Sequence, residues 1–279
     1  MEPESKFLHL EYLKQFQADR TKWAIARRSR HTSGGGDGRR GGGFSLRVVG
    51  DFFAALVSQI AASLGLLTPV PAYALSETQK RGLNALAMRA HEAYDGNKVE
   101  HTDALKKLWS LAFGSKAPPK DLKSESWKEM GWQGCSPTTD FRAGGFLSLS
   151  NLIWLGENKP ETFDKLRHKK NGERSEFEYP FAVAGVNLTF SLVEMCELKE
   201  EAPTTSTGIC FAELIEAHGD EAFERLYALM FETLDDEWLR FGGATYMEFP
   251  LVLKATKQKI VRAMDGAKSF EHVVARLGT

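Results

Sequence analysis

Apolar positions recur every three or four residues along most of the chain, which predicts helices rather than strands. The pattern becomes nearly continuous from Ser76-Glu-Thr-Gln79, which has the form of a capping box. In this motif the Ser and Gln side chains each accept a hydrogen bond from the backbone amide of the other residue. No stretch shows the strict alternation of apolar and polar residues that marks a half-buried strand. We therefore expect an all-α fold, with one multi-helix domain over residues 76–279.

Turn signals divide this domain into successive helices. Pro160 and Ser269 mark two helix starts, and glycines mark several ends. The predicted helices cover residues 76–94, 102–113, 160–170, 181–198, 219–240 and 244–264, one that begins with 146–154, a short one around Trp127 and Met130, and a last short one after Ser269. Residues 202–208 are expected to form a polar loop. The helices of 146–154 and 181–198 are apolar nearly all round, which predicts a central position.

Residues 1–75 form an N-terminal extension of a different character. Residues 1–28 have the pattern of a charged, weakly amphipathic helix, and residues 29–47 are a Gly/Arg-rich linker with too little apolar surface to fold. The apolar segment 52–75 has no charged residue, but two prolines end its apolar run before the roughly 20 residues that a membrane span needs. We interpret it as a helix that covers the core or contacts a membrane surface. An organelle-targeting segment is the open alternative.

Composition and charge add few constraints on function. The 36 basic and 37 acidic residues leave a formal net charge of −1, which favours no particular class of partner. The widely spaced Cys135, Cys196 and Cys210 fit neither a disulfide framework nor a zinc site, so we expect free thiols in a reducing cytosol. The seven His form no close pair, and we expect no metal site. The acidic run Asp235-Asp-Glu237 is interpreted as a solvated helix face.

The segment Trp127-Lys-Glu-Met-Gly-Trp-Gln-Gly-Cys-Ser-Pro-Thr-Thr-Asp-Phe-Arg-Ala-Gly-Gly145 carries the strongest signal for function. Pro137 fixes a turn, while Gly144 and Gly145 permit backbone conformations that other residues adopt only at a cost. Arg142 stands two residues after Asp140 on this stiff turn. The arrangement predicts a guanidinium that is aimed at a ligand.

Spacing alone leaves two interpretations of Asp140 and Arg142 open. In the first, they form a buried ion pair that ties the loop to the helical bundle, and Gln133 satisfies backbone groups. In the second, Asp140 accepts hydrogen bonds from backbone amides or holds Arg142 until a phosphate displaces it, and the Gln133 side-chain amide braces the loop. Trp127 and Trp132 are expected to be core anchors.

The segment from Trp127 to Leu149 resembles the signature of the ELMO domain, W-x-x-[IVM]-G-[FW]-Q-x-x-x-P-x-T-D-x-R-G-x-G-x-x-x-L. The resemblance covers roughly residues 76–265, is closest to plant-type members, and also involves Ala93-Tyr-Asp-Gly96 and residues 179–190. It implies a single ELMO-type domain. One position departs from the pattern, because Ala143 stands where the family has Gly. If this position needs a positive φ, Ala143 strains the turn, and Ala143→Gly is expected to raise activity.

The smaller members of the family, the ELMOD proteins, are GTPase-activating proteins for Arf-family small GTPases. The resemblance therefore implies that Arg142 is an arginine finger supplied to a bound GTPase. It also implies a group of residues that bind the GTPase or position the loop: Trp127, Gly131, Trp132, Gln133, Pro137, Asp140, Gly144 and Gly145.

GTP and Mg²⁺ would then belong to the partner, so no cofactor and no nucleic-acid partner are expected for this chain. The expected location is the cytoplasm, with peripheral contact to an internal membrane through the N-terminal segment. The alternative function is that of a non-catalytic helical adaptor or scaffold in small-GTPase signalling or membrane trafficking, as in the larger ELMO proteins.

Overall fold

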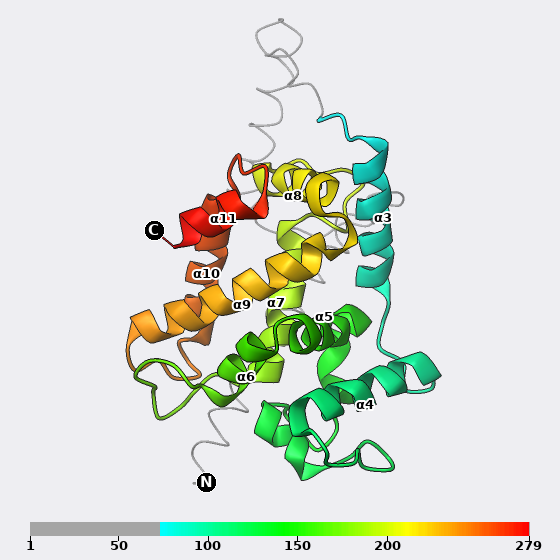
Figure 1. The fold of residues 1–279 in the computed structure, drawn as a ribbon, viewed down its shortest axis with the longest axis vertical. Coiled ribbons are helices and arrows are strands. Elements are labelled where there is room, and N and C mark those ends of the chain that lie inside the picture. Colours follow the sequence, from blue (N-terminus) through cyan, green and yellow to red (C-terminus); the bar gives the residue numbers. More distant parts are fainter. Residues whose placement is uncertain (1–72, 279) are drawn as a thin grey trace, which may run out of the picture. The chain divides into compact units, whose positions relative to one another are not determined.

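A computed structural model of the protein describes residues 73–278, and residues from Leu75 onward form one compact unit. Every regular element in this part of the chain is a helix, which confirms the expected all-α class (Figure 1). The helix, the linker and most of the apolar segment predicted within residues 1–75 lie outside the described residues. No helix of the described part is both long and apolar enough to cross a membrane.

The first described helix, α3 (Glu77–His91), begins at the predicted capping box. Ser76 Oγ accepts from the Gln79 amide at 3.1 Å, and the Gln79 side chain accepts from the Ser76 amide at 2.9 Å. The helix ends a few residues earlier than predicted, because Glu92 adopts an extended conformation and leads into a linker of residues 92–98. The next helix, α4 (Val99–Phe113), ends at Gly114 as predicted.

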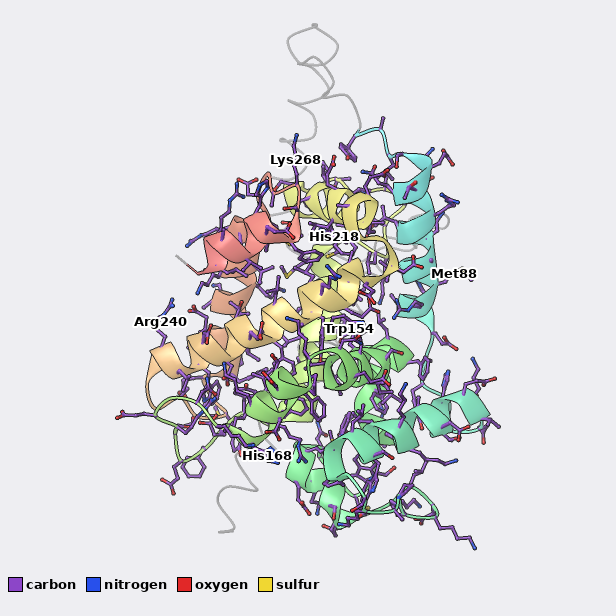
Figure 2. The ribbon with its side chains drawn as sticks, in the orientation of Figure 1. Met88, Trp154, His168, His218, Arg240 and Lys268 are labelled. Atoms are coloured by element: carbon purple, nitrogen blue, oxygen red, sulfur yellow. The ribbon has the colours of Figure 1, made fainter. Side chains whose placement is uncertain are left out.

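Two apolar helices form the centre of the described unit. They are α5 (Gly145–Asn158) and α7 (Phe181–Met195), and they pack against each other, as their composition predicted. The long helix α9 (Ala222–Phe241) crosses them, and α6 (Pro160–His168) follows α5 (Figure 1). Figure 2 shows side chains filling the spaces between these helices.

Helix α8 (Ser206–His218) is the main difference from the sequence prediction, which expected a loop at residues 202–208 and no helix between that loop and Gly219. Thr205 Oγ1 caps it by accepting from the Gly208 amide at 3.1 Å. The polar residues therefore start a helix. This helix packs closely on α3, because a Cβ on Gly82 would lie 2.4 Å from the Ile215 side chain.

The C-terminal part contains α10 (Phe249–Met264) and α11 (Phe270–Leu277). The predicted helix start at Ala244 is wrong, because residues 244–248 form a turn in which the Thr245 amide donates to the Glu248 carboxylate at 2.8 Å. Three short 3₁₀ helices complete the unit: η1 (Glu125–Met130), η2 (Pro137–Arg142) and η3 (Gly219–Glu221).

Asp235 on α9 is fully buried, so the interpretation of residues 235–237 as a solvated face is wrong at this position. Its carboxylate accepts hydrogen bonds from both terminal nitrogens of Arg174 at 2.8 Å, from the Tyr179 hydroxyl at 2.7 Å and from Asn171 Nδ2 at 3.0 Å. Burial alone would raise the pKa of Asp235, but the hydrogen bonds from Arg174 and Tyr179 outweigh it and lower that pKa. One carboxylate thus fixes the connection between α6 and α7.

Candidate functional site

The predicted site is a turn built from η1, η2 and the residues between them. The Ser124 amide donates to the Cys135 carbonyl at 2.8 Å and closes its base. Gly131 ends η1 at a φ of +85°, and a Cβ there would lie 2.7 Å from the Phe181 backbone nitrogen. Only glycine combines this conformation with this approach. The turn therefore lies directly against the start of α7.

Buried aromatic side chains support the turn from beneath. Trp127 and Trp132 meet edge to face with ring centroids 6.5 Å apart, and Trp132 meets Phe141 at 5.1 Å. The Trp127 indole also donates to the Leu122 carbonyl at 3.0 Å. These contacts confirm that both tryptophans are core anchors of this region. The buried Pro137 begins η2 directly above this base.

Asp140 joins the two sides of the turn. Its Oδ2 accepts from the Gln133 amide at 3.0 Å, and its Oδ1 accepts from Thr139 Oγ1 at 3.3 Å. Burial raises the pKa of Asp140, and the Gln133 amide, Thr139 and the positive charge of Arg142 only partly oppose this rise. The Gln133 side chain is exposed, so this residue braces the loop through its main chain rather than through the expected side-chain amide.

Arg142 is the last residue of η2, and its side chain is exposed, whereas Asp140 is half-buried. Because Arg142 is exposed, a contact between the two residues would not be a fully buried ion pair. The hydrogen bond from the Gln133 amide is one of the contacts that the other interpretation expected of Asp140. Arg142 stands at the surface, immediately before the chain enters α5.

The residues after Arg142 correct the expectation for Ala143. Ala143 has a φ of −82° and a ψ of −47°, a helical conformation that any residue adopts, so it does not strain the turn. The requirement for glycine lies two residues later, where Gly145 has a φ of +60° and a Cβ would lie 2.3 Å from the Glu92 carbonyl oxygen. A Cβ on Gly144 would collide with Ser148 Oγ at 1.9 Å.

Behind the turn lies a second layer of aromatic residues, which the sequence did not predict to be part of the site. Tyr94 stacks on Phe141 with ring centroids 4.8 Å apart, and His101 stacks on Phe146 at 3.9 Å. The available signal was Ala93-Tyr-Asp-Gly96, which contributed only to the family resemblance. Tyr94 lies more than 40 residues before Phe141 along the sequence, and this separation gave no indication that the two segments touch.

The described residues offer little for other kinds of chemistry. Within residues 73–278, no group of three or more His, Cys, Asp or Glu side chains is placed to hold a metal ion. The three cysteines are free thiols, with Cys135 exposed and the other two buried.

Comparison with known proteins decides the family. Residues 84–253 match the ELMO/CED-12 family, a range that contains the whole turn and its second layer. The chain belongs to the ELMO/CED-12 family. The resemblance inferred from the signature is thereby confirmed, and Ala143 is a variation within an ELMO domain.

Individual relatives agree with this assignment. The protein is 32% identical over 207 residues to ELMO domain-containing protein C of Dictyostelium discoideum, covering 71% of this chain and 32% of the relative. It is 35% identical over 206 residues to protein A of the same organism, covering 67% and 21%. With human ELMO domain-containing protein 2 it shares 30% over 173 residues, covering 60% and 54%. The chain thus matches between about a fifth and about half of the length of these relatives.

Proposed function

We propose that this ELMO-domain protein is a GTPase-activating protein for Arf-family small GTPases and that Arg142 enters the nucleotide site of the partner. The observation that supports the proposal is an exposed arginine at the end of a 3₁₀ helix whose base is buried and cross-linked by hydrogen bonds. Such an arginine can reach a partner while losing little conformational freedom on binding.

The chemistry of GTP hydrolysis explains why this residue is an arginine. Negative charge develops on the phosphoryl oxygens as the bond to the leaving group breaks, and an arginine from a partner protein neutralises it, accelerating the reaction by about 10³–10⁵-fold. A planar guanidinium can contact two phosphate oxygens at once, which an ammonium group cannot match. GTP and Mg²⁺ are bound by the GTPase, and this chain contributes the guanidinium and the docking surface.

The alternative function is that of a non-catalytic adaptor in small-GTPase signalling or membrane trafficking. The observation that favours it is the low coverage of the two Dictyostelium relatives, in which the matching region is a third or less of the protein. In such a protein the turn is a structural feature and Arg142 has no role in hydrolysis.

The deciding experiment is single-turnover GTP hydrolysis by a panel of Arf-family GTPases, with and without this protein. We expect stimulation of at least one GTPase and a loss of about 10³-fold or more in Arg142→Ala, with little recovery in Arg142→Lys. Binding of the GTPase and the melting temperature should stay close to wild type. The control is Arg262→Ala, which removes another exposed arginine, on α10.

Two results would contradict the proposal. If no GTPase of the panel is stimulated although at least one binds, the protein is an adaptor. If Arg142→Ala loses binding in proportion to activity, the arginine contributes to docking rather than to the transition state.

A further inference from the structure

The linker between α3 and α4, residues 92–98, forms the surface on which the Arg142 turn rests. The Glu92 carbonyl accepts from the Phe146 amide at 2.9 Å. The same carbonyl oxygen leaves no room for a Cβ on Gly145. The chain immediately after Arg142 therefore follows the course of this linker.

His101, in the first turn of α4, holds the linker in place. Its ring is buried, with 2% of its surface exposed, and Nδ1 accepts from the Asp95 amide at 2.9 Å. Because Nδ1 is an acceptor in this arrangement, the ring proton is on Nε2, which lies 3.1 Å from Glu92 Oε1 and donates to it. One imidazole thus ties the Asp95 amide to the Glu92 side chain.

The face of the same ring packs on the turn. The His101 and Phe146 rings are 3.9 Å apart and within 11° of parallel, and Phe146 lies four residues after Arg142. The other ionisable residues near the imidazole are Asp95, Tyr94, whose ring centroid is 5.5 Å away, and Lys98, whose ammonium bonds to Glu92 at 2.8 Å. Protonation of Nδ1 would remove the acceptor of the Asp95 amide and would leave that amide facing a donor.

We infer that His101 is a positioning residue that sets the direction of Arg142 through the 92–98 linker and Phe146, and that its protonation loosens the turn. The inference rests on the proposed function of Arg142. A displacement of about 1 Å of a group that stabilises a transition state can cost about 100-fold in rate, so a shift of the linker has a measurable effect without any contact between His101 and the nucleotide.

Two variants remove different contacts of the ring, and the inference predicts that each is needed. His101→Phe keeps a ring to stack on Phe146 but removes both hydrogen bonds, while His101→Asn keeps an oxygen acceptor near the position of Nδ1 and removes the stack. For both we expect a loss of about 10- to 100-fold in the maximal rate of stimulated hydrolysis, with the half-saturating GTPase concentration unchanged. Wild-type stimulation should fall with the protonation of His101, and both variants should lack this step.

A readout without GTPase distinguishes failure of this inference from failure of the proposed function. The protection factor of the Phe146 amide against hydrogen exchange, measured by NMR and corrected for the intrinsic pH dependence of exchange, should fall in His101→Phe. In the wild type it should fall over the pH range in which NMR shows the His101 ring to protonate. This result supports the coupling even if no GTPase is stimulated.

The inference would be overturned if the protection of the Phe146 amide against hydrogen exchange did not depend on the protonation of His101. A His101→Phe protein with the wild-type maximal rate and pH profile would also overturn it. If His101→Phe does not fold, the wild-type pH series on the Phe146 amide decides alone.

Discussion

Ala143 and Gly145 lie two residues apart in the same turn, yet the backbone places opposite demands on them. Ala143 is in the right-handed helical region, where a Cβ is favourable. Gly145 has a positive φ and touches the Glu92 carbonyl. The sensitivity of the turn to substitution therefore lies at the contact with the 92–98 linker and not at the residue that follows Arg142.

Opposite substitutions at these two positions test this difference. Ala143→Gly should leave the maximal stimulated rate unchanged and lower the free energy of unfolding by roughly 0.5–1 kcal/mol, because glycine loses more conformational entropy on folding. Gly145→Ala should lower both the melting temperature and the stimulated rate. A higher rate in Ala143→Gly, measured at saturating GTPase, would show that Ala143 does restrict Arg142.

Lys169 is a buried amine that follows α6. Its Nζ lies 3.0 Å from the centroid of the Tyr179 ring and has no hydrogen-bond partner among the described residues. Burial lowers the pKa of Lys169 from 10.5 to about 7, although the charges of Asp235 and Glu178 oppose this shift. Because the folded pKa lies below the unfolded one, the unfolded protein binds more protons between pH 7 and 10.5, and stability from this group rises with pH across that window.

Lys169→Met should therefore stabilise the protein, by about 1–4 kcal/mol, because an apolar chain replaces a buried amine. The gain should be largest below pH 7 and should disappear above pH 10.5. Chemical denaturation at a series of pH values measures it, with Lys170→Met, at the exposed neighbouring position, as the control. A gain that does not vary with pH would mean that Lys169 does not titrate in this way.

At the scale of elements, the connection between α6 and α7 is fixed by polar contacts rather than by regular structure. Arg174 and Tyr179 both bind Asp235, and Pro180 then begins the segment against which Gly131 packs. The lowered pKa of Asp235 means that its contribution to stability is present above the unfolded value, near 3.8, and is lost as the pH falls through the lower folded value.

Asp235→Ala should lower the free energy of unfolding at neutral pH by about 3–5 kcal/mol, because it removes the main counter-charge of Arg174, leaving only Glu178 at 3.4 Å, and takes the acceptor from the buried Tyr179 hydroxyl. The neighbouring Asp236→Ala is the control, since that side chain is exposed and the same helix carries it. Denaturant titrations should show the deficit of Asp235→Ala narrowing below pH 3.8. Equal effects of the two substitutions would rule out a special role for the buried carboxylate.

At the scale of the whole molecule, residues from Leu75 onward form a compact unit that begins just before the capping box of α3. We expect a protein of residues 75–279 to remain soluble and to unfold in one cooperative transition. Calorimetry and size-exclusion chromatography test this expectation, with the full chain as the reference. Aggregation of the shortened protein would show that apolar residues within 52–74 belong to the folded core.

Local patterns in the sequence were sufficient for most of the fold. The all-α class, the central position of α5 and α7 and the start of α3 follow from apolar periodicity and from a capping motif, which act between residues close along the chain. The sequence did not predict the start of α8, because its N-cap residue, Thr205, lies among polar residues whose pattern is typical of a loop. The signature itself predicted the stiff turn, while it left open whether Arg142 is buried or exposed.

The tertiary structure alone decided which distant residues support that turn. Packing brings His101 and Glu92 against Phe146. It also buries Asp235, although the acidic residues 235–237 were predicted to form a solvated helix face. These contacts depend on how helices pack in space, and no spacing along the chain encodes them. The sequence therefore determined most of the helices and the family, while three-dimensional packing determined which distant residues support the turn that carries Arg142.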